Sequence, residues 1–502
     1  MRDPFSNPFC ESTDLGLAIP ESAHATSVCL PCWEDIIGYE EKDERVINRM
    51  ECGYPRFMAH PFVAELFLAA QREFAGNGEA ALVFPSLAAA WRCGDFVKQQ
   101  SGISCRLESY GWGELCVVLL PKDAYETSWK YWQHAGEIVS SRMAESALKD
   151  DALDDDAVFS GEAALSIIRS RLAADYSGVD PGDVFLFSSG MAAIFAIHRI
   201  LTDHQSGLPT IQVEFPYRDT FKLQEQFGRG GIADFSITQT GGLDEVRNFF
   251  DLGNRAAAVY TEVPSNPLLR TANLKAIQPI LRENGVPLVI DDSIATGRNV
   301  EPFRFADVVT TSLTKSFSGE GDVAGGAVFL HPDSPFYDVL KSGLPDAESA
   351  SPLFLRDATV LEINSRHFPE RTAGYNANAL ALVDLLSGHP KVAKIWHPSV
   401  GSTANYEAIR KDAGGYGGLL SILLKGEQPA LSARFYDSLK LSKGPSFGTN
   451  FSLISPYVLL AHYQELDWAR ARGVDPNLIR IWTGLEDGSD LLTSVERALD
   501  QL

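Results

Sequence analysis

The sequence predicts an α/β protein whose largest part is a mainly parallel sheet flanked by helices. From about residue 183 onward, short apolar runs alternate with amphipathic stretches, which is the pattern of strand-helix-strand units. The runs at 256–263, 287–291, 307–312 and 325–330 are typical of buried strands. Between the first two, Asn273 is suited to cap the start of a helix and Gly285 to end it, so we expect a crossover helix there.

Length and pattern divide the chain into three regions. Its 502 residues exceed what one core usually supports. We predict an N-terminal extension over 1–150, a large sheet-containing domain over 151–370 and a smaller C-terminal α+β domain over 371–502. The acidic run KDDALDDD at 149–156 repels itself and indicates an exposed loop at the first boundary. Helical patterns at 371–386 and 491–502 begin and end the last region.

Composition and charge exclude several classes of partner. A formal net charge of -23 repels a phosphate backbone and no basic run offsets it, so we expect no nucleic-acid partner. No window reaches the roughly 20 apolar residues of a membrane span, and the first residues have no signal-peptide pattern. We therefore expect no membrane partner and a cytoplasmic location. Cys29 and Cys32 have the spacing of a metal pair, but no second pair follows, so no metal site is expected.

Polar residues follow several of the predicted strands. Asp291 and Asp292 end one strand, and Ser312, Thr314 and Lys315 end the next. Ligands bind beyond the carboxyl ends of the strands in open α/β sheets. A further strand runs into Ser189, Gly190 and Met191, where a helix of about ten residues begins. The free N–H groups at such a helix start suit a phosphate.

These groups together match the needs of pyridoxal 5'-phosphate (PLP). That cofactor needs an amine for an imine link, an acid beside its pyridine nitrogen and a clamp for its phosphate. Each signal alone is weak, because short motifs of this kind are usually loops and caps. Their joint occurrence in one predicted α/β domain indicates a PLP site.

The sequence also resembles the cysteine/methionine-metabolism family of PLP enzymes, and within it the long fungal cystathionine γ-synthase type. The motifs that carry the resemblance follow one another in the order SSGMAA at 188–193, EVPSNP at 262–267, VIDDS at 289–293, SLTK at 312–315, GEGDVAGG at 319–326, SFG at 446–448 and RIWTGLE at 480–486. The N-terminal phrases HATSVCLP, GYPRF and WQHAG are similar to those of the long type. The resemblance implies PLP fold type I, as in aspartate aminotransferase.

The resemblance also implies roles for single residues. Lys315 would bind the cofactor covalently and move protons, with Tyr217 stacked on the ring as the other catalytic residue. The implied cofactor-binding residues are Ser189, Gly190, Met191, Tyr217, Asn266, Asp291, Ser293, Ser312, Thr314 and Lys315. The substrate carboxylate would meet Arg480, Ser446 and Asn266, with Arg480 as a bidentate clamp.

The sequence departs from the family at three places. Relatives carry a Tyr-x-Arg motif that reaches the phosphate of a neighbouring subunit, whereas the matching stretch here ends in His134. His134 is our candidate for that contact, with Arg142 and the Tyr54-Pro-Arg56 stretch as alternatives. The family implies a homo-oligomer, dimer or tetramer, with shared active sites. Trp482 places an indole beside the carboxylate clamp, where we expect it to reshape the pocket, and it favours the alternative of a different acceptor. No glutamate stands near Phe451, where many cystathionine enzymes have one.

The implied function is γ-replacement on an O-acylhomoserine, with cysteine as the nucleophile and cystathionine as the product. The substrates would thus be small amino acids. The alternatives are γ-substitution with a carbon or sulfide nucleophile in a biosynthetic pathway, a γ-elimination lyase, and a non-catalytic relative. The last is disfavoured because Lys315, Asp291 and Arg480 are all present.

Overall fold

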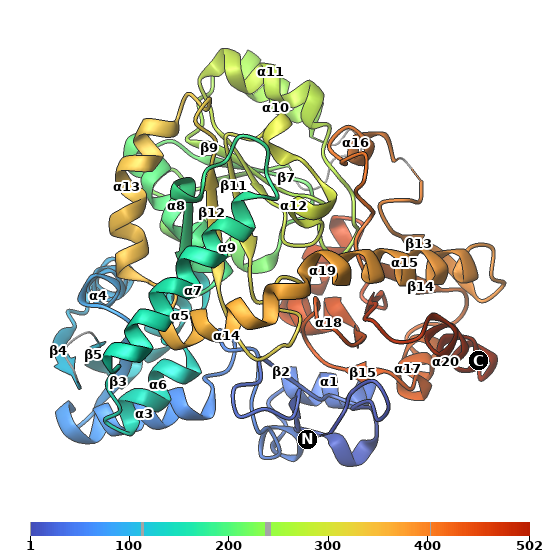
Figure 1. The fold of residues 1–502 in the computed structure, drawn as a ribbon, viewed down its shortest axis with the longest axis horizontal. Coiled ribbons are helices and arrows are strands. Elements are labelled where there is room, and N and C mark those ends of the chain that lie inside the picture. The colour runs from blue at the N-terminus through green and yellow to red at the C-terminus, as the bar shows by residue number, and fades with distance from the viewer. Residues whose placement is uncertain (1, 112–114, 236–241, 402) are drawn as a thin grey trace.

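The computed structural model describes residues 2–111, 115–235, 242–401 and 403–502, and a seven-stranded sheet lies at its centre (Figure 1). The strand order is β6-β12-β11-β10-β9-β7-β8. The strands are β6 (Val184–Phe187), β7 (Thr210–Val213), β8 (Ile232–Phe235), β9 (Ala258–Glu262), β10 (Leu288–Asp291), β11 (Val308–Ser312) and β12 (Gly326–Leu330). All neighbouring pairs are parallel except those of β12. The predicted α/β class with a mainly parallel sheet is confirmed.

The four predicted strands correspond to β9, β10, β11 and β12, and the predicted crossover helix is α11 (Leu274–Asn284). The Asn273 side chain accepts a hydrogen bond from the N–H of Ala276, and Gly285 ends the helix in the left-handed conformation at φ 63°. Strand β12 runs antiparallel to β11. Only turns and loop, without a helix, join the two strands, and a parallel return would need a long crossover.

The two faces of the sheet are covered by different helices, because successive side chains of a strand point to opposite faces. In β10, Val289 packs in one hydrophobic cluster with α8 (Gly190–His204) and α13 (Tyr337–Ala350). Leu288 and Ile290 pack in another cluster with α7 (Asp155–Ala173), α11 and α14 (Leu355–Asn364). The sheet therefore lies between two helical layers.

The acidic run at 149–156 is only partly a loop, which corrects the sequence prediction. The Asp154 side chain accepts a hydrogen bond of 2.8 Å from the N–H of Ala157, so it caps α7. Asp155 and Asp156 form the first turn of that helix. Negative side chains are stabilising at a helix N-terminus, because they face its positive dipole end. The charge run that indicated a loop thus also starts a helix.

The C-terminal part is built on a second sheet, of order β13-β14-β17-β16-β15. Its strands are β13 (Val392–Trp396), β14 (Leu419–Leu424), β15 (Ser442–Lys443), β16 (Leu453–Ser455) and β17 (Ile479–Trp482). The expected helices at its two ends are α15 (Phe368–Leu386) and α20 (Gly488–Asp500), with α16 (Ala404–Glu407), α17 (Ala430–Ser438), α18 (Tyr457–His462) and α19 (Leu466–Ala471) between them. No helix of the described residues is both long enough and apolar enough to cross a membrane.

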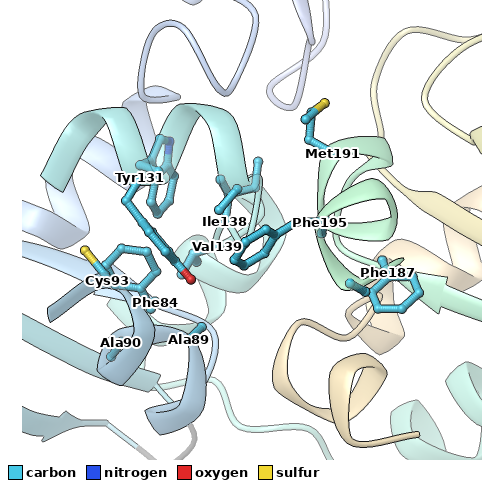
Figure 2. Packing of buried hydrophobic residues seen from close by; sticks show 14 of the residues in the cluster. Phe84, Ala89, Ala90, Cys93, Tyr131, Ile138, Val139, Phe187, Met191 and Phe195 are labelled. Atoms are coloured by element: carbon cyan, nitrogen blue, oxygen red, sulfur yellow. The ribbon is translucent and has the colours of Figure 1, made fainter. Parts of the chain in front are cut away.

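The first 150 residues join two different cores. Leu30, Trp33 and Ile36, near and within α1 (Trp33–Glu40), pack with the C-terminal sheet, and Figure 1 shows this blue segment beside the red C-terminal helices. The rest includes α2 (Glu44–Ile47), α3 (Pro61–Phe74), α4 (Leu87–Ser101), α5 (Tyr125–Ala135), α6 (Ser141–Leu148) and the small sheet of β3 (Glu79–Phe84), β4 (Arg106–Tyr110) and β5 (Leu115–Pro121). Figure 2 shows side chains of this small-sheet region, such as Tyr131 and Ile138, facing Phe195 of α8 within one hydrophobic cluster. The boundaries at 150 and 370 stay predictions.

Candidate active site

A cavity of about 860 Å³ lies at the carboxyl ends of the central strands. That volume is within the range of small-molecule sites. The predicted residues that line it are Gly190, Met191, Tyr217, Asn266, Asp291, Ser293, Ser312, Lys315, Ser446 and Arg480. Three predicted residues, Ser189, Thr314 and His134, are not among its lining residues. The structure thus brings ten of the thirteen predicted positions together around one space.

Lys315 lies buried in the cavity wall. Its Nζ donates a hydrogen bond of 3.0 Å to Ser446 Oγ and lies 4.5 Å from the centroid of the Tyr54 ring. Burial lowers its pKa, while the neighbouring Tyr54 acts in the opposite direction, and among the described residues it makes no ion pair with a carboxylate. A buried ammonium without a counter-charge is costly. The amine is therefore biased toward the neutral form that can attack a carbonyl.

The last residue of β10, Asp291, and the residue after it, Asp292, point in opposite directions. Asp291 lies on the same face as Val289, toward α8, and it lines the cavity. Asp292 is fully buried on the other face, where its Oδ2 accepts a hydrogen bond of 2.8 Å from the Tyr176 hydroxyl. Burial raises the pKa of both acids, and that of Asp292 to about 7. Only Asp291 is placed to meet a ligand.

The start of α8 offers backbone donors to the cavity. Its first residues Gly190 and Met191 line the cavity, and the first N–H groups of a helix have no carbonyl partner within it. Ser189 is the N-cap, so its hydroxyl accepts from the N–H of Ala192 and donates to the carbonyl of Gly136. Its side chain is thus engaged in holding the helix start.

The loop after β11 places Ser312 at the cavity and Thr314 behind it. The N–H of Ser312 donates a hydrogen bond of 2.7 Å to Ser293 Oγ, which joins two cavity residues from neighbouring strands. Thr314 Oγ1 accepts a hydrogen bond of 3.1 Å from the N–H of Gly325. The Thr314 hydroxyl therefore holds the loop to β12.

Tyr217 precedes α9 (Arg218–Phe227) and is held by an acid that sequence reasoning assigned no role. Its N–H donates to Glu262 Oε1, at the end of β9. Burial and the neighbouring Asp291 raise the pKa of Glu262 well above its usual value. The signal for Glu262 in the sequence was its place at a strand end, which it shares with Asp291.

The N-terminal extension contributes Tyr54 and Arg56 to the cavity of its own chain. The Arg56 guanidinium pairs with the buried Asp219 and donates to the Tyr217 hydroxyl. His134 Nδ1 lies 3.1 Å from Asp219 Oδ1, so His134 contacts the acid from behind. The stretch from Trp132 to Val139 is nearly all buried within its own chain, which corrects our expectation that it faces a second subunit.

Arg480 forms the opposite end of the cavity. It is buried on β17, and its guanidinium donates to Asn266 Oδ1 at 3.3 Å and to the Ser446 carbonyl at 2.9 Å. Burial lowers its pKa to about 10, and no carboxylate among the described residues pairs with it. Gly448 lets the Ser446 loop pass close to Lys315, because its φ is 85° and a Cβ there would lie 2.7 Å from Lys315 Cα.

Trp482 lies behind the cavity wall, which corrects the expectation that its indole shapes the pocket directly. Its Nε1 donates a hydrogen bond of 2.7 Å to the carbonyl of Thr449, and its ring packs on Tyr375 and Phe447. Phe447 lines the cavity, whereas Trp482 and Phe451 are not among the lining residues. Any influence of the indole on a ligand therefore acts through Phe447.

The donor set fits PLP. A buried amine that forms no ion pair with a described carboxylate, an acid from the next strand and an open helix N-terminus all line one cavity. An imine would use the amine, the acid would face the ring nitrogen, and the backbone N–H groups would hold the phosphate. Among the described residues, no group of three or more histidines, cysteines or acids is arranged to hold a metal ion.

Comparisons with known proteins agree with this fit. Residues 169–500 match the family model described as Cys/Met metabolism PLP-dependent enzyme, and residues 62–140 match the N-terminal domain of fungal trans-sulfuration enzymes. A cystathionine γ-synthase of Neurospora crassa is 33% identical over 97% of this chain and 98% of the relative. The L-2-amino-4-chloropent-4-enoate dechlorinase/desaturase of Streptantibioticus cattleyicolor is 31% identical over 95% of this chain and 96% of the relative.

The fold also matches solved structures. The crystal structure of cystathionine γ-synthase from Xanthomonas oryzae in complex with aminoacrylate and cysteine superposes with a TM-score of 0.58. It is 25% identical and covers 68% of this chain and 87% of that chain. The uncovered third of this chain is of the size expected for its N-terminal extension.

Proposed function

The chain belongs to the Cys/Met metabolism PLP-dependent enzyme family, and we propose that it catalyses γ-replacement on an O-acylhomoserine with cysteine as the nucleophile. Its cofactor is pyridoxal 5'-phosphate. In the reaction the bond between Cγ and the ester oxygen breaks, and the acyl group leaves as a carboxylate. A bond forms between Cγ and the cysteine sulfur, and the thiol proton is released. The products are cystathionine and a carboxylic acid.

One observation carries the proposal: two buried basic side chains face the same cavity and share Ser446, and neither has a carboxylate partner among the described residues. The Ser446 hydroxyl accepts from Lys315 Nζ at 3.0 Å, and its carbonyl accepts from Arg480 at 2.9 Å. Arg480 is thereby suited to bind the substrate α-carboxylate as a bidentate fork. A substrate held in this way has its α-carbon near the Lys315 amine, which we propose as the base that moves the Cα and Cβ protons.

The cofactor roles of the remaining residues are part of the same proposal. Bound PLP supplies an electron-withdrawing ring that stabilises negative charge at Cα. Asp291 would keep the ring nitrogen protonated, and Tyr217 would cover one ring face. Gly190, Met191 and Ser312 would hold the phosphate, with Ser189 and Thr314 keeping the helix start and the loop in place. Asn266 is hydrogen-bonded to Arg480 and would orient that clamp.

Elimination without replacement is a second candidate. The relative from Streptantibioticus cattleyicolor is a dechlorinase/desaturase, so a protein 31% identical to this chain removes a substituent instead of exchanging it. The same residues of this chain would serve, because elimination and replacement both need the carboxylate clamp and a base at Cα. The difference lies in whether a nucleophile is bound next to the substrate.

Product analysis tests the choice. Purified protein would receive O-acetyl- or O-succinylhomoserine together with cysteine, sulfide and a carbon acid in competition, and mass spectrometry would identify the products. We expect cystathionine as the main product. Release of a keto acid and ammonia at the same rate with and without cysteine would instead identify a lyase.

Assembly and location complete the proposal. We propose a homo-oligomer in the cytoplasm that acts on small amino acids. Sedimentation of the loaded enzyme would give the number of subunits, and an active monomer would contradict the oligomer.

A further inference from the structure

The outer half of the cavity is built by the N-terminal extension. Residues of the extension that line it are Tyr39, Glu40, Lys42, Glu44, Ile47 and Asn48. Residues of α18 and of the turn after it line the same space, and the Tyr463 hydroxyl donates a hydrogen bond to Glu41. This outer chamber is continuous with the space around Lys315. A second molecule can therefore lie beyond the first substrate in the same cavity.

Glu40 faces this chamber without a partner. It is half-buried at the end of α1, and among the described residues it forms no ion pair and accepts no side-chain hydrogen bond. Burial raises its pKa to about 7, while the charge of Arg218 acts in the opposite direction. A desolvated carboxyl group of this kind gains most from a cation that enters with a ligand. Its neighbours Lys42 and Glu44 are exposed, so water already solvates them.

Arg218 faces the chamber from the start of α9 and is also incompletely paired. Its Nε is buried and has no hydrogen-bond partner. Its ion pair with Glu465 is 3.9 Å long, whereas Lys222 lies 3.2 Å from the same acid. Arg218 and Glu40 do not form an ion pair within 4.0 Å in the part of the chain that the structure describes. A negative and a positive group thus face one space with a gap between them.

We infer that Glu40 and Arg218 bind the α-ammonium and the α-carboxylate of the amino acid that enters as nucleophile. The inference rests on the proposed function, and it specifies the acceptor as a zwitterion. In the proposed function Arg480 binds the carboxylate of the first substrate, so the second carboxylate needs a separate cation. A zwitterion placed between Glu40 and Arg218 satisfies both groups at once, and its side-chain sulfur can point inward along the cavity.

A set of three thiols tests each charge separately. Cysteine has both charges, cysteamine lacks the carboxylate, and 3-mercaptopropionate lacks the ammonium. We expect Glu40→Gln to lower kcat/KM for cysteine and cysteamine, relative to 3-mercaptopropionate, by about 10- to 100-fold, the effect of one charge-assisted hydrogen bond. Arg218→Gln should lower kcat/KM for cysteine and 3-mercaptopropionate relative to cysteamine by a similar factor.

The controls separate recognition from folding. Glu34→Gln removes an exposed glutamate of the same helix and should leave all three ratios unchanged. Glu40→Asp retains the charge and should restore part of the preference for thiols that carry an ammonium. The visible absorbance of the bound cofactor should be the same in every variant, which shows that the inner site is intact.

The outcomes distinguish failure of the acceptor site from failure of the proposed function. Equal losses for all three thiols in Glu40→Gln would show a structural role and overturn the inference, while the proposed function would stand. If the parent enzyme joined no thiol to O-acylhomoserine, the proposed function would fail and the acceptor site with it. Selective losses that follow the missing charge would support the inference.

Discussion

The inner and outer walls of the cavity differ in whether their buried basic side chains are paired with an acid. On the inner wall, formed by the strand ends and β17, Lys315 and Arg480 are buried without a carboxylate partner among the described residues. On the outer wall, formed by residues 39–58 of the extension, Arg56 is buried against Asp219, which also meets His134. The inner basic groups therefore have no internal carboxylate partner and are available to a ligand, whereas Arg56 is already neutralised within the protein. We expect inner-wall variants to lose activity, and Arg56 variants to lose stability.

The largest effect is expected for Lys315→Ala. The variant removes both the attachment point of the cofactor and the proposed base, so turnover should fall by about 10,000-fold or more. Borohydride reduction of the yellow parent protein should leave the cofactor bound covalently, and peptide mass mapping should place it on Lys315. Reduced Lys315→Ala protein with as much covalent cofactor as the parent would disprove the assignment.

Arg56→Met should mainly destabilise the fold. Removing one partner of a buried ion pair costs about 3 to 5 kcal/mol, and the contact with His134 favours the lower end of that range. Arg56 lowers the pKa of Asp219, so the stability from this pair is present above the unfolded-state pKa of Asp and is lost as the pH falls through the folded-state value. The gap between parent and variant in urea unfolding should thus be wide at neutral pH and narrower in acid.

The matched control is Arg106→Met. Arg106 pairs with Glu79 and Glu108 at an exposed site, where such pairs contribute less than about 1 kcal/mol. An equal loss of unfolding free energy in both variants would show that burial of the Arg56 ion pair does not increase its contribution to stability.

Asp291→Asn and Asp292→Asn compare two neighbours that differ only in the face they occupy. Loss of the Asp291 carboxylate should weaken protonation of the ring nitrogen and lower turnover by about 100-fold, or roughly 3 kcal/mol of transition-state stabilisation. Asp292→Asn should lower turnover much less, because its partner is the Tyr176 hydroxyl on the far face. Steady-state kinetics with the greater damage in Asp292→Asn would reverse our assignment of the two faces.

The inner wall was predictable from the sequence because strand ends are fixed by local pattern. Once the apolar runs are read as parallel strands, Asp291, Lys315 and Gly190 must lie at one edge of the sheet. The direction in which a single hydroxyl group points was not predictable. Ser189 and Thr314 follow the right strands, but one caps a helix and the other holds a loop. A sequence pattern locates such a side chain without deciding which of two nearby partners it takes.

The outer wall was not predictable because its contacts are between residues far apart in the chain. Residues 39–58 contain only the end of α1 and the four-residue helix α2. Their segment is held by contacts such as that of the Tyr463 hydroxyl with Glu41, 422 residues earlier. The GYPRF stretch was one of three candidates for a contact between subunits, and only the fold showed that it lies at the cavity of its own chain.

The smallest effect on activity is expected for Trp482→Phe, where sequence and structure lead to different expectations. The sequence predicted that the indole reshapes the pocket, which supported the alternative of an acceptor other than cysteine. In the structure Trp482 contacts Phe447 and donates to the Thr449 carbonyl, without lining the cavity. The variant leaves that carbonyl without its donor, so we expect a loss of about 1 to 3 kcal/mol in urea unfolding. The ratio of kcat/KM for cysteine to that for sulfide should change less than about threefold, because Phe447 still forms the wall. A large change in this ratio with unchanged stability would show that the indole reaches the ligand. Trp482 would then belong to the residues that line the cavity, together with Phe447.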